Sequence, residues 1–266
     1  MISMNKKRIL FPINSRGNYA KLKNIILELY KDESVDVVVV LGGSAVLSRY
    51  GNITSHLKKH GITIDSISNF VVEGENLSTM AKSSGLVALD YTNLMDFYDP
   101  DIVIILADRF ECLPIAMIAR YQNRCIVHME GGEHTGLVDD SIRNAITKLS
   151  NYHFVCSEAA KESVVNMGED SSMVFNVGAT SFDEFITASE VNLDDVRDYQ
   201  LEAGTGIELA LTSKQYGICI FHPVTTEYGE NYSYTKELID AVHEQDIEFV
   251  WIWPNMDAGS DGVSKA

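Results

Sequence analysis

The sequence predicts an α/β protein with mostly parallel β-sheets, arranged in two successive domains. Short runs rich in β-branched residues alternate with segments of helical periodicity, which is typical of βαβ units. Several of these runs are apolar throughout, as in strands covered on both faces. The composition changes after about Thr187, and a second alternating pattern follows. With 266 residues, of which 45% are hydrophobic, the chain can bury a large core.

The first domain is predicted to contain at least six strands with helices between them. In chain order the strands are Arg8–Ile13, Val35–Leu41, Asp101–Ala107, Cys125–Met129, His153–Cys156 and Met173–Val177. Three of the helices are Tyr19–Tyr30, Glu111–Tyr121 and Asp139–Leu149. In the third helix Ile142, Ala145, Ile146 and Leu149 recur at i, i+3, i+4 and i+7, which predicts one buried stripe.

The second domain is predicted to be smaller. Residues 188–206 are acidic and polar and are interpreted as a connection plus a helix. A strand at Gly217–Phe221, a helix at Tyr234–Glu244 and a strand at Glu248–Trp253 follow. Two strands and one helix cannot cover both faces of a sheet, so this domain is expected to be incomplete. The predicted division is an N-terminal domain over residues 1–187, then a linker and partial C-terminal domain over residues 188–266.

The net charge and the lengths of the apolar segments argue against several classes of binding partner. The chain has 38 acidic and 21 basic residues, and a net charge of −17 argues against nucleic acid and anionic membranes. The longest near-apolar run, Val35–Leu41, is far shorter than the ~20 residues that span a bilayer. The basic N-terminal flank precedes an apolar run that breaks at Pro12, without a signal-peptide cleavage site. The four cysteines show no metal or C-x-x-C spacing, which favours reduced thiols and a cytoplasmic protein.

Polar or ionisable residues follow five of the predicted strands. Ligands of open parallel sheets bind beyond the carboxyl ends of the strands, and chance supplies one or two such groups, not five. In strand order the groups are Arg16; Asp108 and Arg109; His128, Glu130 and Glu133; His222; and Asn255. Arg16 also opens a helix, where free backbone N–H groups and the helix dipole favour an anion. The pattern predicts a ligand site.

Each of these residues also has an ordinary structural interpretation. Arg16 could be solvated, Asp108-Arg109 could be a surface ion pair, and His222 could be a core histidine. Asp139 and Asp140 open a helix, where acidic residues are common caps. Asp139 and Arg143, however, are four residues apart and share a helix face. Glu130 precedes two glycines, which let the backbone approach a ligand closely.

Known cofactor motifs do not occur. No G-x-G-x-x-G follows the first strand, and there is no P-loop and no helical histidine pair, so neither a nicotinamide cofactor nor a catalytic metal is expected. His128, Glu130, Glu133 and His134 have ligand chemistry, but alternate residues of an extended segment point in opposite directions. Carboxylates with arginines suit proton transfer beside an anionic leaving group. Arginines would hold a diphosphate as it departs.

Five motifs occur in order along the chain: Ala107–Glu111, His128–Glu133, Asp139–Leu149, Phe221–Thr226 and Pro254–Ser260. Together they resemble the hydrolysing UDP-N-acetylglucosamine 2-epimerases, in particular the branch that serves sialic acid biosynthesis. The resemblance implies two Rossmann-like domains, as in the GT-B fold, with the second incomplete in this chain. It further implies a UDP-sugar substrate, no metal or nicotinamide cofactor, and a homo-oligomer, dimeric or tetrameric.

The resemblance also implies a reaction. UDP-N-acetylglucosamine would lose its C2 proton, expel UDP by anti-elimination and add water, giving N-acetylmannosamine. By position in the motifs, Asp108, Glu130 and Asp139 are the acid/base carboxylates, with Arg143 beside them. His222 would contact the diphosphate or assist proton transfer. The expected UDP and substrate contacts are Arg16, Arg109, His128, Asn255 and Ser260.

Some features depart from the family pattern. Ala107 stands where glycine is usual, a change interpreted as mild, and Asn18 replaces an acidic residue. Relatives are expected to continue past Ala266 for roughly another hundred residues, with a loop that grips UDP. Three alternatives stay open: the same chemistry on UDP-2,4-diacetamido-2,4,6-trideoxyglucose for legionaminic acid, a GT-B glycosyltransferase, or an inactive truncated binding subunit.

Overall fold

The computed structural model describes residues 6–187 and 216–266. The chain folds into two compact units. Unit 1 comprises residues 1–73 and 78–183, and unit 2 comprises residues 74–77 and 184–266. The helix expected within residues 188–206 lies outside the described residues.

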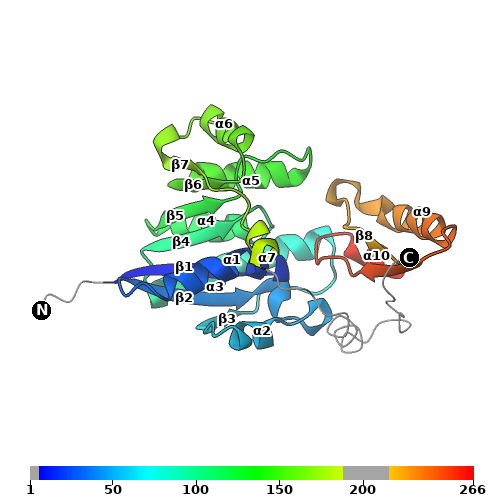
Figure 1. Ribbon diagram of the computed structural model, residues 1–266, viewed down its shortest axis with the longest axis horizontal. Helices are drawn as coiled ribbons and strands as arrows, with labels where there is room; N and C mark the ends of the chain where they lie inside the picture. The colour runs from blue at the N-terminus through cyan, green and yellow to red at the C-terminus, as the bar shows by residue number, and fades with distance from the viewer. Residues whose placement is uncertain (1–5, 188–215) are drawn as a thin grey trace, which may run out of the picture. The chain divides into compact units, whose positions relative to one another are not determined.

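Unit 1 is built on a seven-stranded parallel sheet of order β3-β2-β1-β4-β5-β6-β7 (Figure 1). The strands are β1 Lys7–Ile13, β2 Val35–Gly42, β3 Ser66–Ser68, β4 Ile102–Leu106, β5 Cys125–Met129, β6 Tyr152–Val155 and β7 Val174–Asn176. From β1 the chain proceeds outward to β3, then crosses back to β4, which pairs with the other edge of β1. The strand order therefore reverses between β1 and β4, where sheets of this kind bind ligands.

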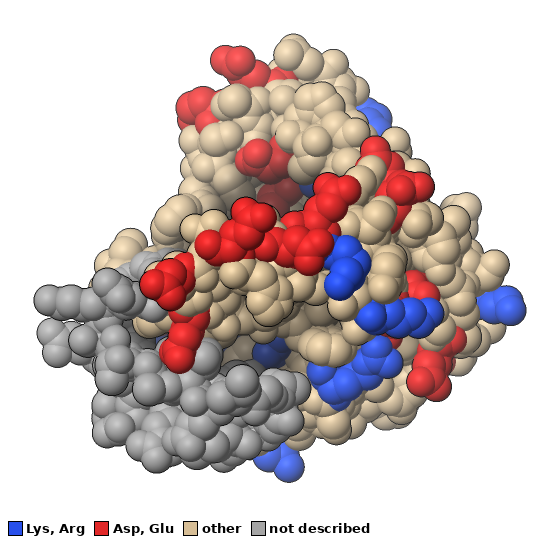
Figure 2. Space-filling model, turned by 90° about the vertical axis from the view of Figure 1, so that its right-hand side faces the viewer, with Lys and Arg blue, Asp and Glu red and all other residues tan. Residues whose placement is uncertain are grey.

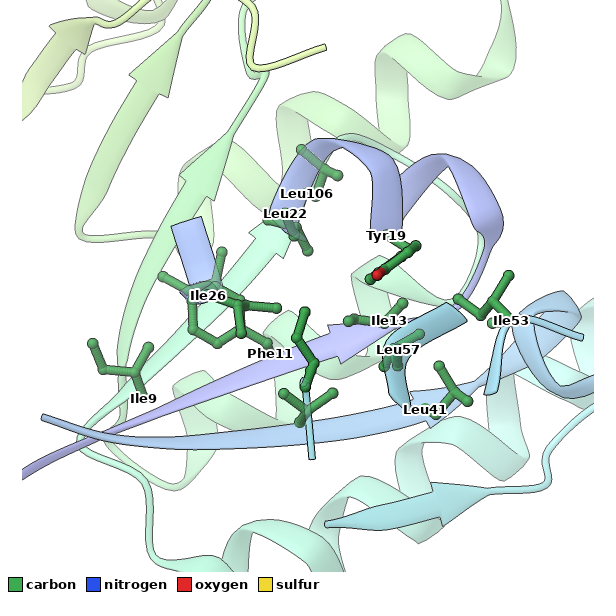
Figure 3. Close-up of a cluster of buried hydrophobic side chains, with 14 of the residues drawn as sticks. Ile9, Phe11, Ile13, Tyr19, Leu22, Ile26, Leu41, Ile53, Leu57 and Leu106 are labelled. Atoms are coloured by element: carbon green, nitrogen blue, oxygen red, sulfur yellow. The ribbon is translucent and has the colours of Figure 1, made fainter. Parts of the chain in front are cut away.

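Helices cover both faces of this sheet. They are α1 Arg16–Leu29, α2 Thr54–Lys59, α3 Leu77–Tyr98, α4 Cys112–Tyr121, α5 Val138–Leu149 and α6 Glu158–Asn166, and α7 Phe182–Thr187 follows β7. Alternate residues of β1 enter two cores, with Phe11 packing toward α1 and Leu10 toward α3 and α4. Figure 3 shows the first core, in which Leu22 and Ile26 of α1 meet Phe11 and Ile13. Among the described residues no helix has both the length and the apolar character needed to cross a membrane.

Unit 2 contains a parallel pair of strands, β8 Tyr216–Ile220 and β9 Glu248–Ile252. Between them lie a 3₁₀ segment, Thr225–Glu230, and α9 Asn231–His243, and after β9 comes α10 Ser260–Lys265. Residues 74–77 belong to this unit, because the Gly259 N–H donates a 2.9 Å hydrogen bond to the Glu75 carbonyl.

The predicted strands are confirmed to within one residue at each end, since continuous apolar runs mark buried parallel strands well. Helix α1 begins three residues earlier than predicted, because Ser15 caps it by accepting a hydrogen bond from the Asn18 N–H. Several elements were not predicted, among them β3 and α3. The strand β3 is a three-residue edge strand. Helix α3 buries a stripe at four-residue spacing, Ser83, Val87, Tyr91 and Met95, which exposed apolar residues of the same helix, Leu86, Leu89 and Phe97, obscure in the sequence.

Candidate active site

The first loop of the site follows β1 and is ordered by its own polar side chains. The Ser15 hydroxyl accepts from the Asn18 N–H at 3.1 Å, and the Asn18 side-chain oxygen accepts from the Asn14 N–H at 3.2 Å. Asn18 is buried, so its amide has a structural role in which a negative charge is not needed. These bonds place Arg16, which is exposed, at the N-terminus of α1. A Cβ added to Gly51 would lie 3.1 Å from a guanidinium nitrogen of Arg16, so the loop that contains Gly51 packs closely against the arginine.

The chain leaves β4 and β5 through residues in the left-handed region. Ala107 has φ +59° and Glu130 has φ +62°. The Ala107 N–H still donates to the Met129 carbonyl at 2.9 Å, and the Glu130 N–H donates to the Phe154 carbonyl at 2.8 Å. A left-handed conformation costs a residue with a Cβ about 1–2 kcal/mol, so alanine in place of glycine at position 107 is not the mild change expected from sequence.

Arg143 of α5 is the centre of a charged network. Only 5% of this residue is exposed. One guanidinium nitrogen, Nη2, donates to the Asp108 carboxylate that follows β4. The other, Nη1, donates to the Glu133 carbonyl at 2.6 Å and to the Asp140 carboxylate at 2.7 Å. The predicted proximity of Asp108 and Arg143 is therefore observed in unit 1.

The carboxylate that holds Arg143 from its own helix is Asp140. The sequence favoured Asp139 as the face partner of Arg143 and treated Asp140 as an ordinary cap. In the structure Asp140 accepts from Arg143 and also from the Thr135 and Gly136 N–H groups, while Asp139 is half-buried in the same helical turn. The spacing i, i+3 serves an ion pair as well as i, i+4, so sequence spacing alone does not distinguish the two residues.

The Glu130 carboxylate is paired with Lys21 of α1 at 2.6 Å. Its side chain is only 13% exposed, so the pair lies largely out of solvent. Lys21 was not predicted as a site residue. It lies inside a helix and 109 residues from Glu130, and nothing in its local sequence marks it.

Each residue of the Asp108-Arg109 dipeptide has an ionic partner farther along the chain. Asp108 pairs with Arg143, and the Arg109 Nε donates to the fully buried Glu111 carboxylate at 2.6 Å. The Arg109 guanidinium also lies 5.9 Å from the centre of the Phe110 ring. Its charge is thus fixed at the end of β4.

His128 lies inside the protein. It is 0% exposed, and its ring nitrogens lie 3.1 Å from the Thr147 hydroxyl and 3.0 Å from the Ala107 carbonyl oxygen. Burial lowers its pKa to about 4, more than the hydrogen bond to Ala107 raises it, and the nearby charge of Arg143 acts in the same direction as burial. The expected contact of His128 with UDP is replaced by an internal role: a neutral ring that connects β5 to α5 and to the turn at Ala107.

The two glycines after Glu130 serve packing within the protein. A Cβ on Gly131 would lie 2.9 Å from the His128 ring, and a Cβ on Gly132 would lie 2.2 Å from the Ala160 carbonyl oxygen. Gly132 also has φ +81°. The close approach that these glycines permit is to His128 and to α6.

Unit 2 contains the remaining predicted residues. His222 is exposed after β8, and Asn255 follows β9, so the carboxyl ends of two parallel neighbours carry both. The Asn255 side chain accepts from the Asp257 N–H at 3.1 Å, and the Ser260 hydroxyl donates to the Asn255 carbonyl at 2.5 Å. Ser260 is buried, so it orders this loop rather than presenting its hydroxyl.

The chain carries many more acidic than basic side chains. Figure 2 shows many acidic side chains on the face that it draws, in keeping with the net charge of −17. Within residues 6–187 and 216–266, no group of three histidine, cysteine or acidic side chains is placed to hold a metal ion. The four cysteines, all in these ranges, are free thiols.

Known proteins share this sequence and fold. A model of the UDP-N-acetylglucosamine 2-epimerase family matches residues 27–266. A Legionella pneumophila protein named UDP-N,N'-diacetylbacillosamine 2-epimerase (hydrolyzing) is 30% identical over 253 residues, covering 95% of this chain and 65% of the relative. A UDP-N-acetylglucosamine 2-epimerase of Neisseria meningitidis is 28% identical over 257 residues, with 97% and 65% covered. The chain thus spans about 65% of the length of these relatives.

Solved structures agree on the fold. The structure of the Neisseria meningitidis UDP-GlcNAc 2-epimerase bound to UDP-GlcNAc superposes with a TM-score of 0.73 at 16% identity, covering 97% of this chain and 69% of that one. A Methanocaldococcus jannaschii UDP-GlcNAc 2-epimerase in complex with UDP-GlcNAc and UDP also gives 0.73, at 15% identity, with 97% and 68% covered. The α/β fold with parallel sheets is the GT-B-like fold of these structures, as predicted. The chain belongs to the UDP-N-acetylglucosamine 2-epimerase family.

Proposed function

We propose that this protein is a hydrolysing 2-epimerase that converts UDP-N-acetylglucosamine to N-acetylmannosamine and UDP. One observation carries the proposal beyond family membership. Two part-buried carboxylates, Asp108 and Glu130, follow adjacent strands beside the point where strand order reverses, and each has its own cation, Arg143 or Lys21. Carboxylates held in this way can exchange protons with a substrate without moving.

The chemistry needs at least two proton transfers. A carboxylate removes the proton from C2, the released electron pair forms the C1–C2 double bond, and the C1–O bond breaks with its electron pair leaving on UDP. Water then adds across the double bond, with its hydroxyl at C1 and a proton delivered to C2 on the opposite face. Asp108, Glu130 and Asp139 are the groups proposed for these transfers, which requires them to act as base and acid in turn.

The cations are proposed to stabilise the negative charge that develops on the departing diphosphate. Arg16 at the N-terminus of α1 combines a guanidinium with the positive end of the helix dipole, which suits a phosphate. Arg109, held by Glu111, is the second proposed phosphate contact. His222 and Asn255 are the proposed contacts from unit 2, with Ser260 supporting Asn255.

A second substrate is favoured by a specific observation. The Legionella pneumophila relative, at 30% identity, is named for UDP-N,N'-diacetylbacillosamine, which is the diacetamido-trideoxy sugar considered above. The two reactions break the same bonds and differ only at C4 and C6 of the sugar. The proposed setting is the biosynthesis of sialic or legionaminic acid by a cytoplasmic homo-oligomer.

Turnover of the two sugars tests the proposal. The chain is incubated with each UDP-sugar, and ¹H NMR follows release of the free 2-epimeric sugar and UDP. We expect release from at least one sugar, and the faster reaction identifies the substrate. Turnover of neither would refute the proposal, and transfer of the sugar to an acceptor would indicate a glycosyltransferase instead.

Variants at the carboxylates test the assignment of the site. Asp108→Asn and Glu130→Gln are expected to lower kcat at least ~100-fold while UDP affinity, measured by calorimetry, changes less than ~3-fold. Asp101→Asn is the matched control, because Asp101 also pairs with a cation, Lys7 at 2.7 Å, but precedes β4 at the opposite end of the sheet. Equal loss of turnover in the control would mean that the effect is structural.

A further inference from the structure

Asp140 accepts more hydrogen bonds than an ordinary helix cap. One carboxylate oxygen, Oδ1, accepts from the Thr135 N–H at 2.9 Å, from the Thr135 hydroxyl at 2.7 Å and from Arg143 Nη1 at 2.7 Å. The other, Oδ2, accepts from the Gly136 N–H at 2.8 Å and contacts the His134 ring nitrogen. Both oxygens therefore connect one loop, residues 133–137, to α5.

The same loop contributes to the position of Arg143. The Glu133 carbonyl accepts from Arg143 Nη1, the nitrogen that also donates to Asp140. Residues 133–137 are exposed to solvent, so burial of apolar side chains contributes little to fixing them. Asp140 thus binds both the loop and the guanidinium, so each helps to fix the position of the other.

The remaining side of the guanidinium reaches Asp108. Nη2 donates to the Asp108 carboxylate, and a guanidinium is planar, so fixing Nη1 at two oxygens fixes the direction in which Nη2 points. Arg143 is almost fully buried, and an unpaired charge at such a place is strongly unfavourable, so the network is held together as a unit.

We propose that Asp140 is the positioning residue that orients the Arg143 guanidinium, and through it the Asp108 carboxylate, for the reaction proposed above. It needs no contact with substrate. The inference rests on the proposed function for its catalytic part, while the orientation of Arg143 is a property of the folded chain alone. The pKa of Asp140 supports the assignment. Burial raises this pKa, but hydrogen bonds from Thr135, Gly136 and His134 outweigh burial and hold the pKa of the carboxyl well below its usual range.

The first experiment measures the guanidinium directly. Rotation of the Arg143 guanidinium is followed by ¹⁵N NMR, with Arg143→Lys used to assign its signals. In Asp140→Asn, which keeps the shape of the side chain but removes its charge, we expect rotation to become at least ~10-fold faster because a charge-assisted bond is lost. Unchanged rotation would overturn the proposal, whether or not the chain turns over a UDP-sugar.

The second experiment measures catalysis. Asp140→Asn is expected to lower kcat about 10- to 100-fold with little change in KM, the size of effect produced by ~1 Å of misplacement. In an Arg143→Lys background the same substitution is expected to change kcat less than ~2-fold, because the group through which it acts is already gone. An equal loss in both backgrounds would show that Asp140 acts independently of Arg143.

A matched variant separates positioning from capping. Asp170 caps a 3₁₀ turn in unit 1 with the same chemistry, accepting from the Ser172 N–H at 2.9 Å and from its hydroxyl at 2.8 Å. Asp170→Asn is expected to lower Tm but to leave both kcat and Arg143 rotation unchanged. If Asp140→Asn behaved like Asp170→Asn in all three measurements, Asp140 would be a cap only.

Discussion

Two residues of the candidate site, Ala107 and Glu130, have positive φ angles of +59° and +62° although neither is glycine. Each is the first residue after a strand, and each still donates its N–H to the neighbouring strand. The turn redirects the chain so that Asp108 reaches Arg143 and Glu130 reaches Lys21. Backbone strain is therefore located where the carboxylates are presented, as is common at functional sites.

At position 107 the strain can be relieved by substitution. Ala107→Gly is expected to raise the free energy of unfolding by about 0.5–1 kcal/mol, because the relief of the left-handed conformation exceeds the added entropy of the unfolded chain. Urea denaturation measures the change. The control Ala159→Gly, at an exposed position of α6, is expected to lower stability by about 0.5–1 kcal/mol. A destabilised Ala107→Gly would contradict this account.

The buried His128 makes stability depend on pH. Its folded pKa of about 4 lies below the ordinary value of 6.5, so between these values only the unfolded chain binds the proton. The contribution of His128 to the free energy of unfolding is therefore fully present above pH 6.5. It is lost as the pH is lowered toward 4, and the loss amounts to up to about 3 kcal/mol. Urea melts at pH 7 and 4.5 are expected to show the loss.

A variant isolates this contribution. His128→Gln is expected to lose less stability between pH 7 and 4.5 than the original chain does, although it starts from a lower value. His56→Gln, at an exposed position of α2, is the control and is expected to keep the original pH dependence. An unchanged dependence in His128→Gln would mean that other groups, such as His153, whose pKa burial also lowers, account for it.

At the scale of elements, α1 brings two cations to the site. Its first residue, Arg16, lies at the helix N-terminus, and Lys21, about 1.4 turns later, pairs with Glu130. The Ser15 cap and the buried Leu22 and Ile26 fix the helix, and thereby the position of Lys21, against the sheet. The helix thus supplies the cation for a carboxylate two strands away from β1.

The pair between α1 and Glu130 is expected to matter for turnover. Lys21→Gln should lower kcat/KM at least ~10-fold under the proposed function, because the Glu130 side chain loses its charged partner in a largely buried place. Lys21→Arg should recover part of the loss. Lys31→Gln, which breaks an exposed pair with Glu28, is the control and should retain full activity. Steady-state kinetics on either UDP-sugar measures all three, and full activity of Lys21→Gln would contradict the role.

At the scale of the whole molecule, the two units differ in how they bury their strands. In unit 1 the central strands β1, β4 and β5 have neighbours on both edges and helices on both faces. In unit 2, Ile218 and Ile220 of β8 are 62% and 56% exposed. A strand that buries few apolar side chains is expected to open locally at a lower free energy.

Hydrogen exchange is expected to follow this difference. Amide protons of β8 should exchange at least ~100-fold faster than those of β4, because opening β8 exposes little additional apolar surface. The edge strand β7 of unit 1 is the control for edge position alone, and it should be intermediate. Equal protection of β8 and β4, measured by mass spectrometry, would contradict the expectation.

Much of unit 1 could be predicted from sequence because its signals are local. Apolar runs marked the strands, and polar residues after them marked Asp108, Arg109 and Glu130 at neighbouring strand ends. Predictions about individual partners were less successful. His128 has the same strand-end signal as Glu130, yet it is buried, because it lies within β5 and its ring contacts Thr147. Glu130 lies in the left-handed turn that follows the strand.

The sequence by itself determined the α/β class, the strand positions and the family motifs, since these depend on neighbours within a few residues or on ordered identities along the chain. Only the tertiary structure decided that Lys21 pairs with Glu130, that Asp140 holds Arg143, and that His128 is internal. Side-chain pairing across 109 residues, or the choice between adjacent aspartates, depends on how elements cross in space. The periodicity of a single element does not contain that information.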